Sequence, residues 1–235
     1  MENYKFKNST MSKKNQNQEE VVVAEAVSKT EKFFEDNGKK VIIALVVLLL
    51  LVAGGYAYKY LVMDKNEAAA AELIVAAQEN FSGEAPNYDL ALNGDETGAG
   101  FLAVAEQYGA TKAGNLAKHY AGICYLHLGD LEKAAEYLAK YKKVRGLAAE
   151  VVNAQNLGLQ GDVAVEQGDY EKAAKFFKKA VNASDNNYTA PLYLYKQGLA
   201  LAAAGDAEGA KACYKAITEK YPNSSESRDA EKLLY

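Results

Sequence analysis

A long apolar stretch stands near the start of the chain. Eighteen residues without a charged side chain lie between Lys40 and Lys59, and eleven of them are Val, Ile or Leu. As a helix at about 1.5 Å per residue they span roughly 27 Å, close to the ~30 Å hydrocarbon core of a bilayer. We therefore predict a transmembrane anchor over residues 41–63, with the tyrosines near its end at the membrane interface.

Two other interpretations of this stretch are a cleaved signal peptide and a helix buried in a protein core. A signal peptide has a short charged region before its apolar part and a small-residue cleavage site after it. Here forty residues precede the apolar stretch and no convincing cleavage site follows it. An uncleaved membrane anchor is therefore the favoured interpretation.

The lysines that flank the stretch predict its orientation. Four lysines lie in residues 21–40, whereas residues 59–78 carry two. The flank richer in Lys and Arg usually stays in the cytoplasm. We therefore expect residues 1–40 to form a cytoplasmic tail and residues 66–235 to cross the membrane.

The tail itself, residues 1–40, has two predicted parts. Residues 1–20 are rich in Lys, Asn, Gln and Ser, so they cannot bury enough apolar surface to fold alone. Residues 21–37 favour a short amphipathic helix that Gly38 would end. The apolar side of that helix would carry Val23, Val27, Phe33 and Phe34. Such a helix would rest on the inner membrane surface or dock on another membrane protein, and the first is favoured.

The remainder of the chain repeats the pattern G-x6-G-D-x-E-x-A three times, and the copies begin 39 and 37 residues apart. This regularity indicates an internal structural repeat. The small residues of the three copies are Gly122, Gly129 and Ala134; Gly161, Gly168 and Ala173; and Gly198, Gly205 and Ala210.

Each copy predicts a helical hairpin. The second glycine can end the first helix in the left-handed conformation, and the aspartate after it can cap the second helix. The first glycine and the alanine lack a large side chain, so the two helices can approach closely. Larger residues would fill the rest of the contact: Tyr125, Leu138, Phe177, Val181, Leu201, Tyr214 and Ile217. One hairpin cannot bury its apolar side alone, so we expect the copies to stack around a shared core.

The segments beside the hairpins are also predicted to be mostly helical. Residues 66–110 would hold N-terminal helices and one long loop, at 82–100. Residues 111–235 would hold the three hairpins and a C-terminal helix that covers the last of them. Thr111 and Ser224 stand where helix N-caps are expected.

Charge and motif content narrow the function. The 235 residues include 27 Lys and Arg against 31 Asp and Glu, a net charge of -4, which disfavours a nucleic-acid binder. A phosphate-binding Gly-rich Lys motif, an H-E-x-x-H motif and a nucleophile elbow are missing from the sequence. His119 and His127 would lie about 12 Å apart along one helix, too far to share a metal. We therefore expect no enzyme activity, no cofactor, no metal site and no small-molecule substrate.

Two metal-site hypotheses are disfavoured by their residues. Cys124 and His127 could face one ligand, but Cys124 falls at a buried hairpin position and is favoured as a small packed residue. The 82–100 loop lacks the ligand spacing of an EF-hand. An interaction loop or a plain surface loop is favoured there over a calcium site. Its polar candidates are Asp89, Asn93, Asp95 and Glu96.

The repeats resemble the tetratricopeptide repeat (TPR) over residues 116–222. They depart from it where its early tryptophan is replaced by Lys118, Leu157 and Leu194, and only the third copy keeps the closing proline, Pro222. The resemblance implies an all-α solenoid whose first helices line a concave surface that binds other proteins. The positions it implies for that surface are His119, Ile123, Leu126, His127, Asp162, Val165, Glu166, Tyr195, Leu199 and Ala202. Several of these are expected to pack between helices instead, because apolar stripes at helical spacing are usually core.

The sequences EKFFEDNGKK before the anchor and GGYAYKYL at its end resemble those of YfgM-type proteins. These are ancillary subunits of the bacterial Sec translocon that associate with a membrane-anchored periplasmic chaperone. The resemblance implies a single-pass protein of the bacterial inner membrane with a periplasmic C-terminal domain. Its partners would be translocon subunits, that chaperone and emerging polypeptides. A scaffold for another envelope process, such as cell division or outer-membrane assembly, is the alternative.

Overall fold

The computed structural model describes residue 31 and residues 33–234. The chain divides into two compact units, Met1–Val62 and Met63–Tyr235. Within the described residues the regular elements are helices, and no strand is formed. The predicted all-α architecture is therefore confirmed.

One helix, Phe33–Ser82, is long and apolar enough to cross a membrane, and its most apolar window has no buried residue. Gly38 lies inside this helix, so the prediction that it ends a separate amphipathic helix is wrong. A glycine in a helix interior costs only about 1 kcal/mol relative to alanine. A long helix on both sides of Gly38 offsets this small cost, so the helix continues through the glycine.

The four apolar residues assigned to one side of a tail helix are described only in part. Phe33 and Phe34 are exposed on the helix, and their rings meet edge to face with 5.9 Å between centroids. Val23 and Val27 lie outside the described residues.

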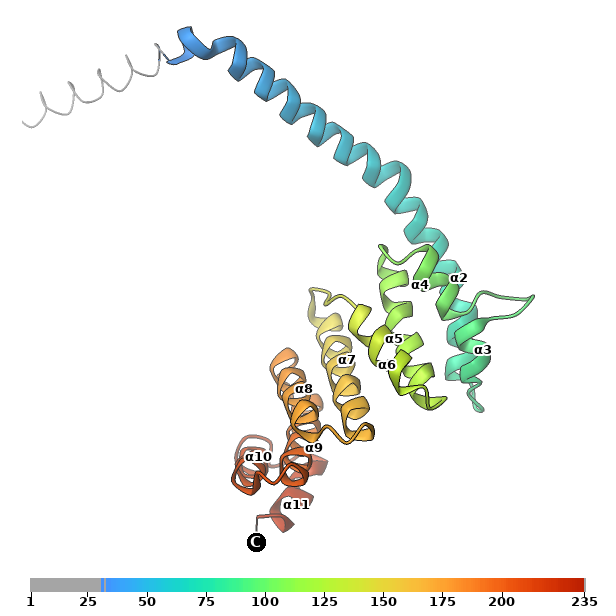
Figure 1. Cartoon of the computed structure of the whole chain (residues 1–235), viewed down its shortest axis with the longest axis vertical. Helices are drawn as coiled ribbons and strands as arrows, with labels where there is room; N and C mark the ends of the chain where they lie inside the picture. The colour runs from blue at the N-terminus through green and yellow to red at the C-terminus, as the bar shows by residue number, and fades with distance from the viewer. Residues whose placement is uncertain (1–30, 32, 235) are drawn as a thin grey trace, which may run out of the picture. The chain divides into compact units, whose positions relative to one another are not determined.

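The second unit contains ten α-helices among its described residues (Figure 1). They follow a π-helical turn, η1 (Lys59–Met63). In chain order they are α2 (Asp64–Ser82), α3 (Tyr88–Asn93), α4 (Phe101–Gln107), α5 (Lys112–His127), α6 (Leu131–Lys140), α7 (Leu147–Glu166), α8 (Tyr170–Ala183), α9 (Thr189–Ala203), α10 (Ala207–Lys220) and α11 (Ser225–Lys232).

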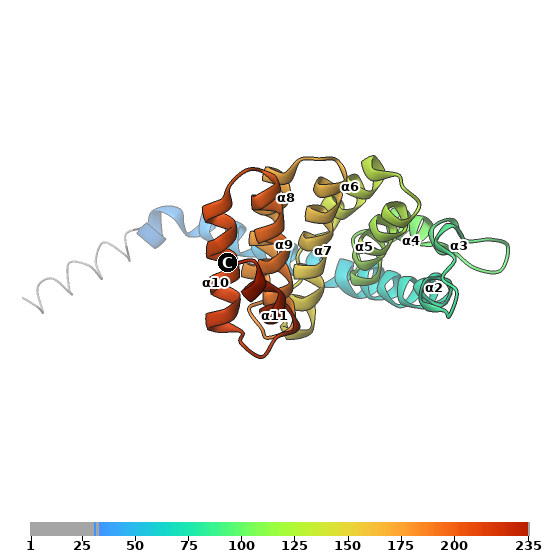
Figure 2. The ribbon, with the colours of Figure 1, turned by 90° about the horizontal axis from the view of Figure 1, so that it is seen from below.

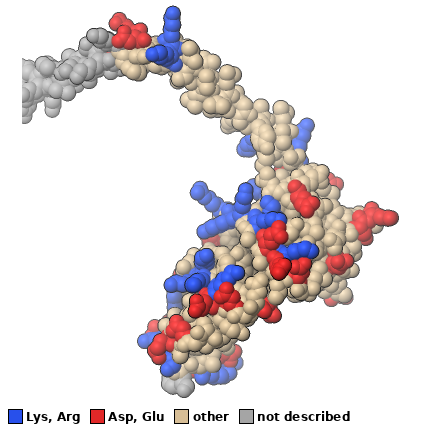
Figure 3. All heavy atoms as spheres, viewed as in Figure 1, with Lys and Arg blue, Asp and Glu red and all other residues tan. Residues whose placement is uncertain are grey.

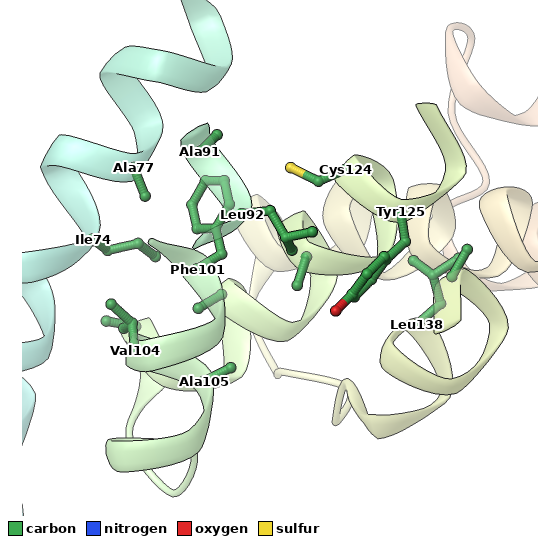
Figure 4. Close-up of a cluster of buried hydrophobic side chains, with 14 of the residues drawn as sticks. Ile74, Ala77, Ala91, Leu92, Phe101, Val104, Ala105, Cys124, Tyr125 and Leu138 are labelled. Carbon is green, nitrogen blue, oxygen red and sulfur yellow. The ribbon is translucent and has the colours of Figure 1, made fainter. Parts of the chain in front are cut away.

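Helices α2, α3 and α4 pack on the first hairpin and share its core (Figure 4). Ile74 of α2, Leu92 of α3 and Phe101 of α4 are buried in one cluster with Cys124 of α5 and Leu138 of α6. The N-terminal helices therefore close one end of the solenoid. This covering satisfies the need of the first hairpin to bury its outer apolar side.

The carboxylate of Glu67 on α2 fixes that helix to the start of α5. It accepts hydrogen bonds from the backbone N–H of Lys112 at 2.8 Å and of Ala113 at 3.2 Å. These donors belong to the first turn of α5, where backbone N–H groups have no partner within the helix and a negative charge is favourable. Glu67 thus acts as a cap supplied from a distant part of the sequence.

The segment 82–100 was expected to be one long loop, and this is wrong because it contains α3. Asn87 caps α3 by accepting a hydrogen bond from the backbone N–H of Leu90 at 3.0 Å. An isolated β-bridge then closes the turn that follows. The Asp95 carboxylate accepts hydrogen bonds from the backbone N–H and the Oγ1 hydroxyl of Thr97, so it stabilises this turn.

The turns inside the three hairpins form as predicted. The second glycines have left-handed φ values, 81° at Gly129, 75° at Gly168 and 88° at Gly205. Each following aspartate accepts a hydrogen bond from the backbone N–H three residues later; the three are Asp130, Asp169 and Asp206. The same short pattern therefore ends one helix and begins the next in every copy.

The first glycine of each pattern marks a close approach between the two helices of its hairpin. A Cβ added at Gly122 would lie 2.6 Å from Cγ of Leu138, and one at Gly161 would lie 2.6 Å from Cε1 of Phe177. The third copy repeats this contact against Tyr214. The three alanines of the pattern are buried as well, so the small residues lie where the two helices of each hairpin approach closely.

The C-terminal helix α11 packs against α9 and α10 and buries Ala230. Thr111 caps α5 as predicted, since its Oγ1 accepts a hydrogen bond from the N–H of Gly114 at 2.9 Å. Ser224 stands at the N-cap of α11 but its hydroxyl has no hydrogen-bond partner, so that predicted side-chain cap is wrong. The backbone carbonyl of Ser224 accepts from the N–H of Ser227 instead.

Candidate protein-binding surface

The first helices of the hairpins, α5, α7 and α9, lie in a row (Figure 2) and carry the ten residues proposed for a binding surface. Two of the ten, His119 and Ile123, are buried, with 1% and 7% of their surfaces exposed. Nδ1 of His119 lies 3.2 Å from Nδ2 of Asn156 on α7. Burial lowers the pKa of His119 to about 4, so the ring is neutral and Nδ1 can accept this bond. His119 therefore joins two helices and offers no exposed surface to a partner.

The end of α5 is covered by the N-terminal helices. Leu126 packs against the buried cluster that α2, α3 and α4 share with the first hairpin. The His127 ring is stacked on that of Tyr88 in α3, with 4.1 Å between centroids and an angle of 1° between planes. The chain's own α3 thus occupies part of the surface predicted on the first repeat.

The second repeat contributes charged and apolar positions. Asp162 on α7 forms an ion pair with Lys196 on α9, with both carboxylate oxygens within 2.9 Å of Nζ. Tyr193 is buried beside them, and burial followed by the charge of Asp162 raises the pKa of its phenol to about 12. Val165 is half-buried and Glu166 is exposed. Asp162 is therefore already neutralised, whereas Glu166 remains available to a partner.

The third repeat presents the most accessible apolar positions. Leu199 is 45% exposed and Ala202 is also exposed. Tyr195 is half-buried, because its ring lies 6.0 Å from that of Tyr214 in the same hairpin. An apolar surface suited to a partner side chain therefore exists on α9, at two of the three predicted positions.

A groove of about 700 Å³ opens between α8, α9 and α10. Its walls are mostly small or apolar, and lysines of α8 stand at its rim; among the lining residues are Ala174, Lys178, Leu194, Leu201, Ala212 and Cys213. At about 100° per residue, the positions of α9 that line it are roughly 130° around the helix from Tyr195, Leu199 and Ala202. The groove therefore lies on a different face from the predicted surface.

Sequence reasoning missed this groove. The signal for it was a run of small residues at helical spacing on α10: Gly209, Ala212, Cys213 and Ala216. Small side chains at such spacing also serve close helix packing, as Ala134 does in the first repeat. Only the packing of neighbouring helices decides whether such a stripe is covered or left open.

The two cysteines have the environment of packed side chains. Cys124 is fully buried, as predicted for a small packed residue, and burial raises the pKa of its thiol to about 12. Burial also raises the pKa of Cys213. Across residues 31 and 33–234, no cluster of three or more His, Cys, Asp or Glu side chains is placed to hold a metal ion.

Comparison with known proteins agrees with this geometry. Two family models of the tetratricopeptide repeat match the chain, one over residues 117–144 and one over residues 164–234. Within these two ranges the helical hairpins of the solenoid match the tetratricopeptide repeat. The first match contains the turn between α5 and α6, and the second runs from the end of α7 through α11. No curated protein matches the chain.

Proposed function

We propose that this protein is a non-enzymatic scaffold, anchored in the bacterial inner membrane, whose tetratricopeptide repeats bind other proteins in the periplasm. The observation that carries the proposal is the exposed apolar strip on α9, at Leu199 and Ala202, on a solenoid of repeats. Solenoids of this kind use the surface lined by successive repeats to bind partners. The apolar helix near the N-terminus supplies the anchor.

The partners we propose are subunits of the Sec translocon, a membrane-anchored periplasmic chaperone and polypeptides that emerge from the translocon. The support for this choice is the resemblance of residues 31–40 and 54–61 to the anchor region of YfgM-type proteins. The anchor would hold the repeat surface near emerging chains and so raise the effective concentration for weak contacts. A scaffold for cell division or outer-membrane assembly is the second candidate, and it would use the same surface.

Purification of the full chain from native membranes in mild detergent, after crosslinking, tests the choice of partner. Quantitative mass spectrometry should find translocon subunits and the anchored chaperone enriched with the wild-type chain. Changing Phe33 and Phe34 to alanine should lower recovery of the translocon while the repeat domain stays folded. Enrichment of division or outer-membrane assembly factors in place of the translocon would decide for the second candidate.

Two matched variants test which face binds. Leu199→Asp places a charge on the surface lined by α5, α7 and α9, and Ala212→Asp places the same charge in the groove between α8, α9 and α10. Both positions are exposed, so both variants should fold. Loss of an apolar anchor typically costs more than 1 kcal/mol of binding, so Leu199→Asp should lower partner recovery about tenfold. If Ala212→Asp lowers it and Leu199→Asp does not, the binding face is the groove.

The predicted orientation has its own test. Single reporter cysteines near Asn15 and Asn223, in a chain whose two native cysteines are replaced by alanine, should differ in their reaction with a membrane-impermeant maleimide. From outside spheroplasts only the reporter near Asn223 should react. Reaction of the reporter near Asn15 under the same conditions would show that the N-terminus lies outside the cytoplasm, opposite to the prediction.

A further inference from the structure

The connection between α6 and α7, residues 141–146, displays three cations in four residues. Lys142, Lys143 and Arg145 are exposed, and in Figure 3 positive side chains gather over this connection. Within the described part of the chain, no carboxylate lies within ion-pair distance of any of the three. Lys140, just before them, differs from the three because it is paired with Glu136 at 2.6 Å. The surrounding residues 66–235 carry a net charge of -6, so this basic surface opposes the charge of its own domain.

Two buried asparagines hold the connection in place. Asn115 of α5 donates to the carbonyl of Lys142 and accepts from its N–H, both at 2.8 Å. Asn153 of α7 makes the same pair of bonds with Val144, at 2.8 and 3.1 Å. Because hydrogen bonds fix the backbone at Lys142 and Val144, the connection loses little backbone freedom when its side chains bind a ligand.

Folding does not account for these charges. Cations in the last turn of a helix stabilise its dipole, but α6 ends at Lys140 and the three cations follow that end. The next connection between hairpins, residues 184–188, carries no Lys or Arg, and its Asp185 pairs with Lys220 at 2.7 Å. A basic connection is therefore not a requirement of the repeat.

The connection lies at the edge of the domain where the chain enters it. Glu67, four residues after Met63, is hydrogen-bonded to the first turn of α5, and Asn115 one turn later is bonded to Lys142. At 1.5 Å of rise per helical residue, these steps place the connection on the order of 20 Å from Met63. The proposed anchor ends near Met63, so the covalent chain allows this edge of the domain to reach the bilayer surface.

We propose that the α6–α7 connection binds the anionic phospholipid headgroups of the membrane in which the anchor sits, and so orients the repeat domain on that membrane. The proposal rests on the anchor of the proposed function. Exposed Lys and Arg next to an anionic bilayer are attracted by its surface potential. Leu147 follows directly and is 85% exposed, so an apolar side chain stands beside the cations to enter the interface. The surface lined by α5, α7 and α9 is then held at a set distance from the bilayer.

Lysine reactivity in nanodiscs tests this proposal with the full chain. The chain is inserted in discs of phosphatidylcholine alone or of phosphatidylcholine with phosphatidylglycerol at roughly 7:3, and acetylation of each lysine is followed by mass spectrometry. Lys142 and Lys143 should react about threefold or more slowly in the anionic discs, and salt of about 0.5 M should remove the difference by screening. Lys175 and Lys211, which are exposed on α8 and α10, should react alike in both discs.

A charge-matched pair of triple variants separates a local contact from general attraction. Hydrogen exchange in the first turn of α7 should be slower in anionic discs for the wild-type chain. Changing Lys142, Lys143 and Arg145 to glutamate should abolish that protection, whereas changing Lys172, Lys175 and Lys179 on α8 to glutamate should leave it. Thermal unfolding of both variants checks that each is folded.

Equal acetylation of Lys142 and Lys143 in the two kinds of disc would overturn the proposal. Protection in native membranes but not in the purified anionic discs would also overturn it, and would assign the surface to an acidic protein instead. Failure of the chain to elute with the discs would overturn the anchor itself, and with it this inference.

Discussion

Nζ of Lys196 lies 2.8 Å from Oδ1 of Asp162, and this ion pair joins the first helices of the second and third hairpins. The two side chains are 34% and 30% exposed, so solvent screens the pair only in part. One of its members was assigned from the sequence to a binding surface. In the folded protein that carboxylate contributes to the stacking of repeats.

Removal of this pair should destabilise the domain modestly. Asp162→Asn keeps the shape of the side chain and should lower the free energy of unfolding by about 1 kcal/mol, because Lys196 then loses its charged partner. A double-mutant cycle with Lys196→Met, measured by urea unfolding, should give a coupling energy of about 0.5–1 kcal/mol. The exposed pair Lys215–Glu219, at 3.6 Å, is the control and should show almost no coupling. Equal coupling in the two pairs would contradict this account.

Enlarging a small residue of the repeat should destabilise a hairpin. Ala173 is fully buried against the preceding helix, so Ala173→Leu should lower the free energy of unfolding by about 1–3 kcal/mol through overpacking. Ala203→Leu, on the exposed side of α9, is the matched control and should change it by less than about 0.5 kcal/mol. Thermal or urea unfolding measures both. A change in the free energy of unfolding for Ala173→Leu as small as that for Ala203→Leu would mean that Ala173 does not stand at a close helix contact.

His119 should make the stability of the domain depend on pH. Burial lowers its pKa to about 4 in the folded chain, against roughly 6.5 when unfolded. Between these values the unfolded chain binds a proton that the folded chain does not. The stability that this group contributes is therefore complete above about pH 6.5 and falls as the pH drops toward 4, by up to about 3 kcal/mol.

The measurement is urea unfolding at several pH values for the wild type and for His119→Gln. The difference between the two curves isolates His119 from the carboxylates that titrate in the same range, and it should slope between about pH 4 and 6.5. A flat difference for His119→Gln would show that burial does not control this ring.

The two cysteines should report on different degrees of opening. Cys124 is fully buried and its thiol pKa is raised to about 12, so it should react with iodoacetamide only when the domain unfolds. Cys213 also has a raised pKa, but it lines the groove between α8, α9 and α10 and should react slowly in the folded state. Timed alkylation followed by peptide mass spectrometry distinguishes the two. Faster reaction of Cys124 than of Cys213 in the native protein would contradict the placement of the groove.

The features that the sequence predicted well are local in the chain. A glycine in the left-handed conformation and an aspartate cap need only the backbone groups within about four residues, so Gly168 and Asp169 could be assigned from the pattern alone. The same holds for Thr111, whose cap on α5 is made within three residues. The short helix α3 lies outside the repeated pattern and was not predicted, because one asparagine cap is weaker evidence for a helix than a pattern that occurs three times.

The sequence by itself determined the long apolar helix, the three hairpins and the small residues where their helices touch, because each depends on side-chain size, hydropathy or hydrogen bonding between near neighbours. Only the tertiary structure decided which helical faces stay open. Whether His119 is buried, whether Tyr88 stacks on His127 and whether α8 and α10 leave a groove between them all depend on helices dozens of residues away. The bonds from Glu67 to Lys112 and from Asn115 to Lys142 are of the same kind, at separations of 45 and 27 residues. A linear pattern cannot reveal them, because their partners come together only when the repeats stack.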